Sequence, residues 1–454
     1  MQAVSDFSRG KVSGTILRLA MPMVVAQLVN VLYNIVDRMY IGNIPEIGDM
    51  ALAGVGICGP IVTMISSVAS WVGIGGAPLL SIRLGQKNEK KAREILANCF
   101  LLLVVMSLAI TALAFLTKDR LLVWFGASEA IFPYADEYIT VYLLGTVFAL
   151  LTTGMNQFII CQGFAKVGMK SVLLGAVCNI VLDPVFIFVL DMGVAGAAIA
   201  TVISQAVSCI YVLSFLFGSR PMIRITFGGY RWDIMARVLL VGLTPFLIIA
   251  LDNIMIISLN ATIQKYGGPE RGDMLLTCNT ILQSFMLIVT MPLSGITGGT
   301  QTILGYNYGA RRPERIIKAQ KNILLLCLAF TGIMFLIAQI IPQYFTMIFT
   351  RDPEYISMTS RAIRIYSLMI VPLAVQYTVV DGFTGMGIAK VAISLSTFRK
   401  IIYFGGIFLI PVWFDITNIF FIEPISDLTA AVVSGATYAV MIRKISSSLK
   451  GASS

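Results

Sequence analysis

The chain has 454 residues, of which 57% are hydrophobic and 12% charged, and it carries a formal net charge of +10 with no histidine. This composition excludes an ordinary soluble domain, in which about a quarter of the residues are charged. The lack of histidine excludes histidine metal centres and histidine-dependent catalytic triads, so any proton chemistry must use carboxylates.

Apolar stretches of about 20 residues, long enough to cross a bilayer as helices, recur along the whole chain. In chain order they lie near residues 17–41, 51–80, 95–117, 134–160, 171–190, 194–217, 238–262, 274–304, 322–341, 358–385, 391–413 and 424–442. The pattern predicts an all-α polytopic membrane protein with twelve transmembrane helices.

The second half of the chain repeats the first at an offset of about 223 residues. Matching positions are Pro22 and Pro245, Asn30 and Asn253, Gly75 and Gly299, and Gly85 and Gly309. Six spans per copy is an even number, so the two repeats are parallel. We predict an N-lobe at 12–217 (helices 1–6), a cytoplasmic linker at 218–232 and a C-lobe at 233–445 (helices 7–12). Because a duplicated helix bundle is the usual build of a secondary transporter, function is expected between the halves.

The positive charges are spread over alternate loops and are not gathered on one face, which argues against a nucleic-acid partner. They include Arg9, Lys11, Lys87, Lys90, Arg93, Lys166, Lys170, Arg220, Arg224, Arg231, Arg311, Arg312, Lys390, Arg443 and Lys444. The remaining loops carry Glu46, Asp119, Glu129, Asp191, Asp352 and Asp415. By the positive-inside rule both termini are cytoplasmic. We expect a monomer in the plasma membrane (the inner membrane of a bacterial cell), without a cleaved signal peptide or lipid anchor.

Carboxylates inside spans are costly and mark functional sites by default. Asp37 shares a helix face with Asn34 and Tyr33, while Asn179 and Asp183 are one turn apart. Asp183 lies about 12 Å from the outer turn and Asp37 about 8 Å, from the rise per residue. Two carboxylates and an amide at similar depth are suited to a proton or a hard monovalent cation such as Na⁺. The alternative is structural: Asp37 pairs with a neighbour, and Asp183 satisfies the turn broken by Pro184.

The second repeat does not keep this chemistry, since Asn260 stands where the first has Asp37. Asp381 and Arg399 both lie nine residues from Lys390 on antiparallel helices, so they are predicted to form a charge pair. The alternative to a structural charge pair is that Asp252 or Asp381 takes part in proton movement.

Several segments resemble the multidrug and toxic compound extrusion (MATE) transporters, in the DNA-damage-inducible branch. They are Ala20 to Pro22, Tyr33 to Asp37, Asn179 to Phe186, Gly193 to Thr201, Arg399, and Glu423 to Asp427. The resemblance covers almost the whole chain. It implies two six-helix lobes around a central cavity, exporting bulky, often cationic amphiphiles in exchange for H⁺ or Na⁺.

The resemblance also implies residue roles. In that family the positions matching Asp37, Asn179, Asp183 and Thr201 form the cation site of the N-terminal lobe, and no cofactor beyond the coupling ion is needed. Some members carry a glutamate near the place of Asp252 and Asn253, and an aspartate near that of Gln376. Their absence here weakens the prediction of a C-lobe cation site.

Two other functions would make different demands on the sequence. A flippase of the same superfamily would move a lipid-linked sugar or peptidoglycan precursor and would need a cationic cavity, for which Arg399 and Lys400 are candidates. A membrane-embedded enzyme, such as a lipid transferase or protease, would need a catalytic cluster at a membrane surface. The sequence has no such cluster, so no enzyme is predicted.

Overall fold

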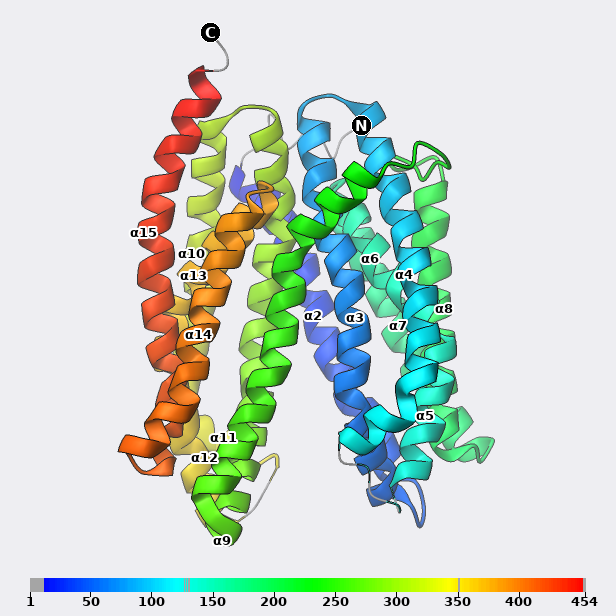
Figure 1. The fold of residues 1–454 in the computed structure, drawn as a ribbon, viewed down its shortest axis with the longest axis vertical. Coiled ribbons are helices and arrows are strands. Elements are labelled where there is room, and N and C mark those ends of the chain that lie inside the picture. The colour runs from blue at the N-terminus through cyan, green and yellow to red at the C-terminus, as the bar shows by residue number, and fades with distance from the viewer. Residues whose placement is uncertain (1–11, 126, 128, 130, 350–351, 452–454) are drawn as a thin grey trace.

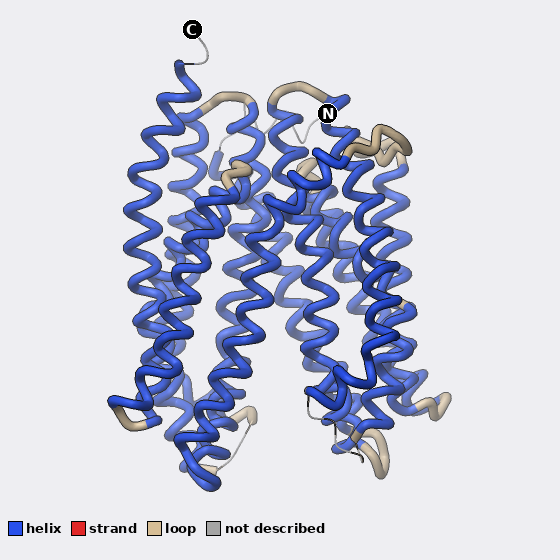
Figure 2. Tube along the Cα trace, viewed as in Figure 1, coloured by secondary structure: helices blue, strands red, loops and turns tan. Residues whose placement is uncertain are grey.

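The computed structural model describes residues 12–349 and 352–451, apart from positions 126, 128 and 130. Arg9 and Lys11, which contribute to the predicted topology, lie outside the described residues. Every regular element in the described ranges is helical (Figures 1 and 2). The N-lobe helices are α2 (Val12–Gly42), α3 (Gly48–Gly85), α4 (Glu89–Trp124), α5 (Phe132–Leu144), α6 (Thr146–Ile160), α7 (Ala165–Pro184) and α8 (Gly193–Phe217). The C-lobe helices are α9 (Trp232–Gly309), α10 (Pro313–Ile340), α11 (Pro342–Thr346), α12 (Pro353–Tyr366), α13 (Ile370–Gly385), α14 (Ala389–Trp413) and α15 (Ile422–Gly451).

The described helices make up the predicted twelve spans. Eleven are long and apolar enough to cross a membrane, and α5 with α6 makes a twelfth that is bent by 57°. The helix α9 holds two spans, which meet at Gly268, where φ is 68° and only glycine fits readily. The short helix α11 was not predicted, because its five residues are too few to show a helical pattern.

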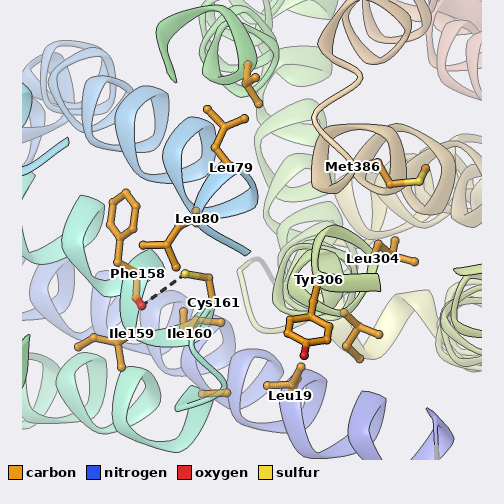
Figure 3. Close-up of a cluster of buried hydrophobic side chains, with 14 of the residues drawn as sticks. Leu19, Leu79, Leu80, Phe158, Ile159, Ile160, Cys161, Leu304, Tyr306 and Met386 are labelled. Carbon is orange, nitrogen blue, oxygen red and sulfur yellow. Dashed lines mark hydrogen bonds between the residues drawn. The ribbon is translucent and has the colours of Figure 1, made fainter. Parts of the chain in front are cut away.

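The two lobes share a core at one end and have separate cores at the other. The shared core combines Leu19 and Leu80 of the N-lobe with Leu304 and Met386 of the C-lobe (Figure 3). Near the opposite end, the buried residues of the core around Ile41 all belong to the N-lobe, and those of the core around Ile263 all belong to the C-lobe. The ribbons accordingly approach each other at the end where α2 begins and α15 ends, and diverge away from it (Figure 1).

Glycines form the seam between the lobes at the shared end. A methyl group on Gly242 of α9 would lie 1.7 Å from the carbonyl oxygen of Trp71 on α3. One on Gly309 would lie 2.1 Å from that of Ile82, and one on Gly85 would lie 2.1 Å from that of Tyr306. The backbones of α3 and α9 therefore touch directly. The indole of Trp71 also donates to the Leu239 carbonyl at 2.7 Å and stacks on Phe246 with ring centroids 4.4 Å apart.

Two buried amides fasten residues 218–231, which contain no helix, to the N-lobe. Asn98 of α4 donates to the Gly229 carbonyl at 3.0 Å and accepts from the Arg231 amide at 2.8 Å. Gln162 makes the same two-way contact with the backbone of Ile223, at 3.1 and 2.8 Å. The linker is thus held by specific hydrogen bonds to one lobe.

We expect Asn98→Ala to lower the free energy of unfolding by about 1–3 kcal/mol, because it leaves backbone groups of the linker without partners. Thermal unfolding of the detergent-purified protein measures the loss. Asn43→Ala is the matched control, since the exposed Asn43 amide only donates to Met39 of its own helix. Equal melting temperatures for both variants would show that the clamp contributes nothing.

Candidate cation site and adjoining cavity

The end of α7 places Asp183. Pro184 has no amide hydrogen, so it cannot continue the helical ladder. A π-helical turn, Val185–Val189, follows it, and the Leu190 amide donates to the Val185 carbonyl at 2.9 Å. Such turns often occur at functional sites. Asp183 directly precedes this break and is 0% exposed.

Asn179 connects Asp183 to the neighbouring helix. Its side-chain nitrogen donates to Asp183 Oδ1 at 3.0 Å and to Thr201 Oγ1 of α8 at 3.3 Å. All three side chains are buried, which fixes their relative positions. The structure therefore brings together three of the residues selected from the sequence.

Asp37 completes the cluster from α2. Its carboxyl group lies within hydrogen-bonding reach of the Asp183 carboxyl group, and both side chains are buried. Two ionised carboxylates have no hydrogen to share and repel each other, so their close approach is favoured when one is protonated or a cation lies between them. Asp37 Oδ1, Asp183 Oδ2 and Asn179 Oδ1 are buried and have no donor. These three oxygens are free acceptors for a cation.

The ligand types suit a hard cation or a proton. Carboxylate, amide and hydroxyl oxygens are the ligands that hard cations prefer. Among the described residues there is no group of three or more His, Cys, Asp or Glu side chains that could hold a metal ion. The donor set thus fits Na⁺ or H⁺ better than a transition metal.

Asn34, which was predicted to join this site, lies outside it. Its side chain is exposed and donates to the Asn30 carbonyl of its own helix at 2.7 Å. Spacing of three residues puts Asn34 near the face of Asp37, but Asn34 is about 100° further round α2 than Tyr33, and its amide turns to the Asn30 carbonyl. That part of the prediction is wrong.

A cavity of about 250 Å³ adjoins the cluster inside the N-lobe. Asn179 and Thr201 line it, and it extends along α7 and α8 to Ser171 and Ser208, away from Asp183. No charged side chain lines it. Its polar lining consists of Gln27, Asn30, Tyr33, Ser66, Thr152, Thr153, Asn156, Gln157, Ser171, Asn179, Thr201, Ser204, Gln205 and Ser208. The cavity is therefore a neutral hydrogen-bonding space that ends beside two buried carboxylates.

Two tyrosines of α5 were missed. Tyr138 packs near Asp37 and Tyr33, and it stacks with Tyr142 at a centroid distance of 6.2 Å. Tyr142 lies beside Ser66 and Gln205 of the cavity lining. Their spacing of four residues on an otherwise apolar span is a weak signal that could have marked a polar face.

The predicted pair of Asp381 and Arg399 is wrong. Arg399 Nη2 lies 2.5 Å from Glu423 Oε1, and Arg399 Nε donates to Asp427 Oδ1 at 2.8 Å. Asp381 instead faces Thr297 and Gln301 of α9. Equal depth along two helices does not determine which way each side chain points around its axis. Arg399 points to α15, whereas Asp381 points to α9.

The remaining C-lobe candidates are dispersed. Lys400, which is 8% exposed, forms an ion pair with Asp252 of α9. Asn253 donates to the Ile249 carbonyl of its own helix at 2.9 Å, and Gln376 is buried with Oε1 lacking a donor. These residues do not gather into a counterpart of the N-lobe cluster.

Known proteins resemble this chain over most of its length. The family model MatE matches residues 22–185 and 249–409. The chain is 20% identical over 420 residues to the Multidrug export protein MepA of Staphylococcus haemolyticus, covering 91% of this chain and 89% of the relative. It is 24% identical over 368 residues to an FAD transporter of Shewanella oneidensis, covering 79% and 78%.

The fold has solved counterparts. A multidrug resistance MATE family transporter of the MOP superfamily, solved in an outward-facing conformation, matches with a TM-score of 0.91 at 23% identity, over 98% of this chain and 99% of that one. That likeness agrees with the two lobes and twelve spans described above. The match of the family model over both repeats decides the assignment: the chain is a multi-pass membrane protein of the MATE transporter family.

Proposed function

We propose that the protein is a cation-coupled antiporter that exports bulky, often cationic amphiphilic compounds by alternating access, with H⁺ or Na⁺ as the coupling ion. The observation that carries this proposal is the contact between Asp37 and Asp183, whose buried free oxygens require a proton or a cation. A permanent structural pair would have a buried positive partner, whereas the cation that acts on Asp37 among the described residues is Arg38, the next residue of α2, which is exposed.

Coupling follows from the position of the pair. Asp37 is on α2, whereas Asp183 and Asn179 are on α7. A bound cation holds these helices together, and its loss leaves two repelling carboxylates. An ion can drive a conformational change only if it binds two conformations with different affinities. In this proposal the two conformations differ in the separation of α2 and α7, so the ion binds more tightly to the one in which the two carboxylates are close together.

The adjoining cavity supports a small-molecule substrate. Its amide and hydroxyl lining offers hydrogen bonds without selecting one charge, which is compatible with varied compounds. The relatives named as a multidrug export protein and an FAD transporter support the same class of cargo. A flippase is less well supported, because Arg399 and Lys400, the two cations considered for binding a pyrophosphate, are both paired with carboxylates.

The decisive test is efflux of a cationic dye from sealed vesicles that contain the purified protein, with proton and sodium gradients imposed separately. We expect dye movement under at least one gradient and none without a gradient. Dye movement that ignores both gradients would reject cation coupling. Gradient-independent transfer of a lipid-linked sugar would favour the flippase.

The predicted topology is tested by single-cysteine labelling in whole cells. Residues 90, 231 and 312 should be protected from an impermeant thiol reagent, and residues 129 and 352 should react. The native cysteines are buried or half-buried, so their background is low. External labelling at residue 90 would refute the twelve-span orientation with cytoplasmic termini.

A further inference from the structure

The C-lobe contains a second cluster of buried charges, which the proposed function does not use. Arg399 of α14 contacts two carboxylates of α15, with Nη2 at 2.5 Å from Glu423 Oε1 and at 2.8 Å from Asp427 Oδ1. The Glu423 side chain is 8% exposed and that of Asp427 is 0% exposed. The Arg399 guanidinium therefore contacts two carboxylates that are one helical turn apart on α15.

The charges in this cluster do not balance. If both carboxylates were ionised, one positive charge would face two negative charges. Lys400, the next residue of α14, does not correct the balance, because it is paired with Asp252. Asp427 Oδ2 is buried and receives no hydrogen bond. An uncompensated buried carboxylate costs several kcal/mol, so the extra negative charge has to be neutralised.

Among the described residues, the groups that face the cluster add no cation beyond Arg399 and Lys400. The groups that face the cluster are Tyr366 of α12, Tyr377 of α13, Tyr403 and Lys400 of α14, and Asp252 of α9. The hydroxyls of Tyr366 and Tyr403 lie 3.3 Å from each other, and Gln283 donates to Tyr366 at 3.3 Å. None of these hydroxyls donates to Asp427 Oδ2.

We propose that Arg399, Glu423 and Asp427 form a second cation-binding site, which holds one proton on Asp427 Oδ2. The proton adds to the free oxygen, and Asp427 becomes neutral. Arg399 offsets one of the two negative charges through its 2.5 Å contact with Glu423, and the free oxygen of the cluster is on Asp427. This site lies in the other lobe from the pair of Asp37 and Asp183, and it does not rest on the proposed function.

Loss of this proton would act on the contact between α9 and α14. The new negative charge on Asp427 competes with Asp252 for Lys400, which lies within electrostatic reach of both. The Asp252 side chain is 42% exposed, so water can replace Lys400 there more readily than at the buried Asp427. Occupancy of the proton site is thereby linked to an ion pair between two transmembrane helices.

The first test compares two neutral variants of the full-length protein by thermal unfolding in detergent at neutral pH. Asp427→Asn has nearly the shape of the protonated acid and should keep the wild-type melting temperature. Glu423→Gln removes the ionised partner of Arg399 and should melt several degrees lower. Equal destabilisation, or failure of Asp427→Asn alone to fold, would show that Asp427 is ionised and would overturn the proposal.

The second test detects the proton directly. Infrared spectra of protein labelled with ¹³C-aspartate separate the C=O stretch of protonated aspartic acids from glutamate and lipid signals. At neutral pH, the spectrum of Asp427→Asn should lack one component of the protonated-aspartate C=O band. The double variant Asp37→Asn/Asp183→Asn should retain that component. An unchanged acid band in Asp427→Asn would refute the site. A band that sodium removes at constant pH, in the variant lacking Asp37 and Asp183, would show that the site takes sodium in place of a proton.

Discussion

Asp37→Asn and Asp183→Asn should each abolish gradient-driven efflux while leaving expression and much of the substrate binding at equilibrium intact. Each substitution removes one of two buried carboxylates that have free oxygens, and with it the repulsion that cation binding relieves. Dye efflux from vesicles under an imposed proton or sodium gradient measures the loss. Equilibrium binding of the same dye to the purified variants measures what is retained.

Asn34→Ala is the matched control for this experiment. Asn34 lies on the same helix as Asp37, but its exposed side chain bonds only its own backbone. The Asn34→Ala variant should therefore export the dye at the wild-type rate. If both aspartate variants still pump at near wild-type rates, the N-lobe pair is not the coupling site, and the C-lobe groups Asp252 and Asp381 become the better candidates.

Replacing Arg399 with methionine should cost about 3–5 kcal/mol of stability, since it leaves Glu423 buried without its positive partner. We expect a large fall in melting temperature and in the yield of folded protein. Adding Glu423→Gln to Arg399→Met should recover much of the loss, because it removes the buried carboxylate closest to Arg399.

Lys390→Met is the control, because Lys390 is an exposed cation on the same helix. It should change the melting temperature little. Combining Arg399→Met with Asp381→Asn also tests which carboxylate is the partner of Arg399. If Asp381→Asn rescued Arg399→Met better than Glu423→Gln does, the observed partners of Arg399 would be wrong.

The twelve spans could be predicted because each apolar stretch has to be long enough to cross a bilayer, and length can be counted in a sequence. Internal breaks were harder to predict. The bend between α5 and α6 occurs at Gly145, where the side chain of Val202 on α8 leaves no room for a methyl group. A residue that contacts Gly145 only after folding leaves no local signal in the sequence.

The functional site likewise has a part that the sequence predicts and a part that it does not. Helical spacing and the cost of buried charge singled out Asp37 and Asp183, and the structure brings them together. Spacing did not identify the partner of Arg399, because Glu423 is 24 residues away on a helix whose rotation about its axis depends on packing. Depth in the membrane can be estimated from residue counts, but the direction of a side chain cannot.

The glycine seam between α3 and α9 bears on the speed of the transport cycle. At Gly85 and Gly309 the two lobes meet through bare backbone, so parting the lobes there does not require a side chain to be withdrawn from a packed socket. At Gly242 the indole of Trp71 also packs against the glycine and has to be released. The activation barrier for opening this end is then set mainly by the shared apolar core and by the indole hydrogen bond of Trp71. The glycines would thus keep this barrier low, which bears on turnover rate and not on contacts with a substrate.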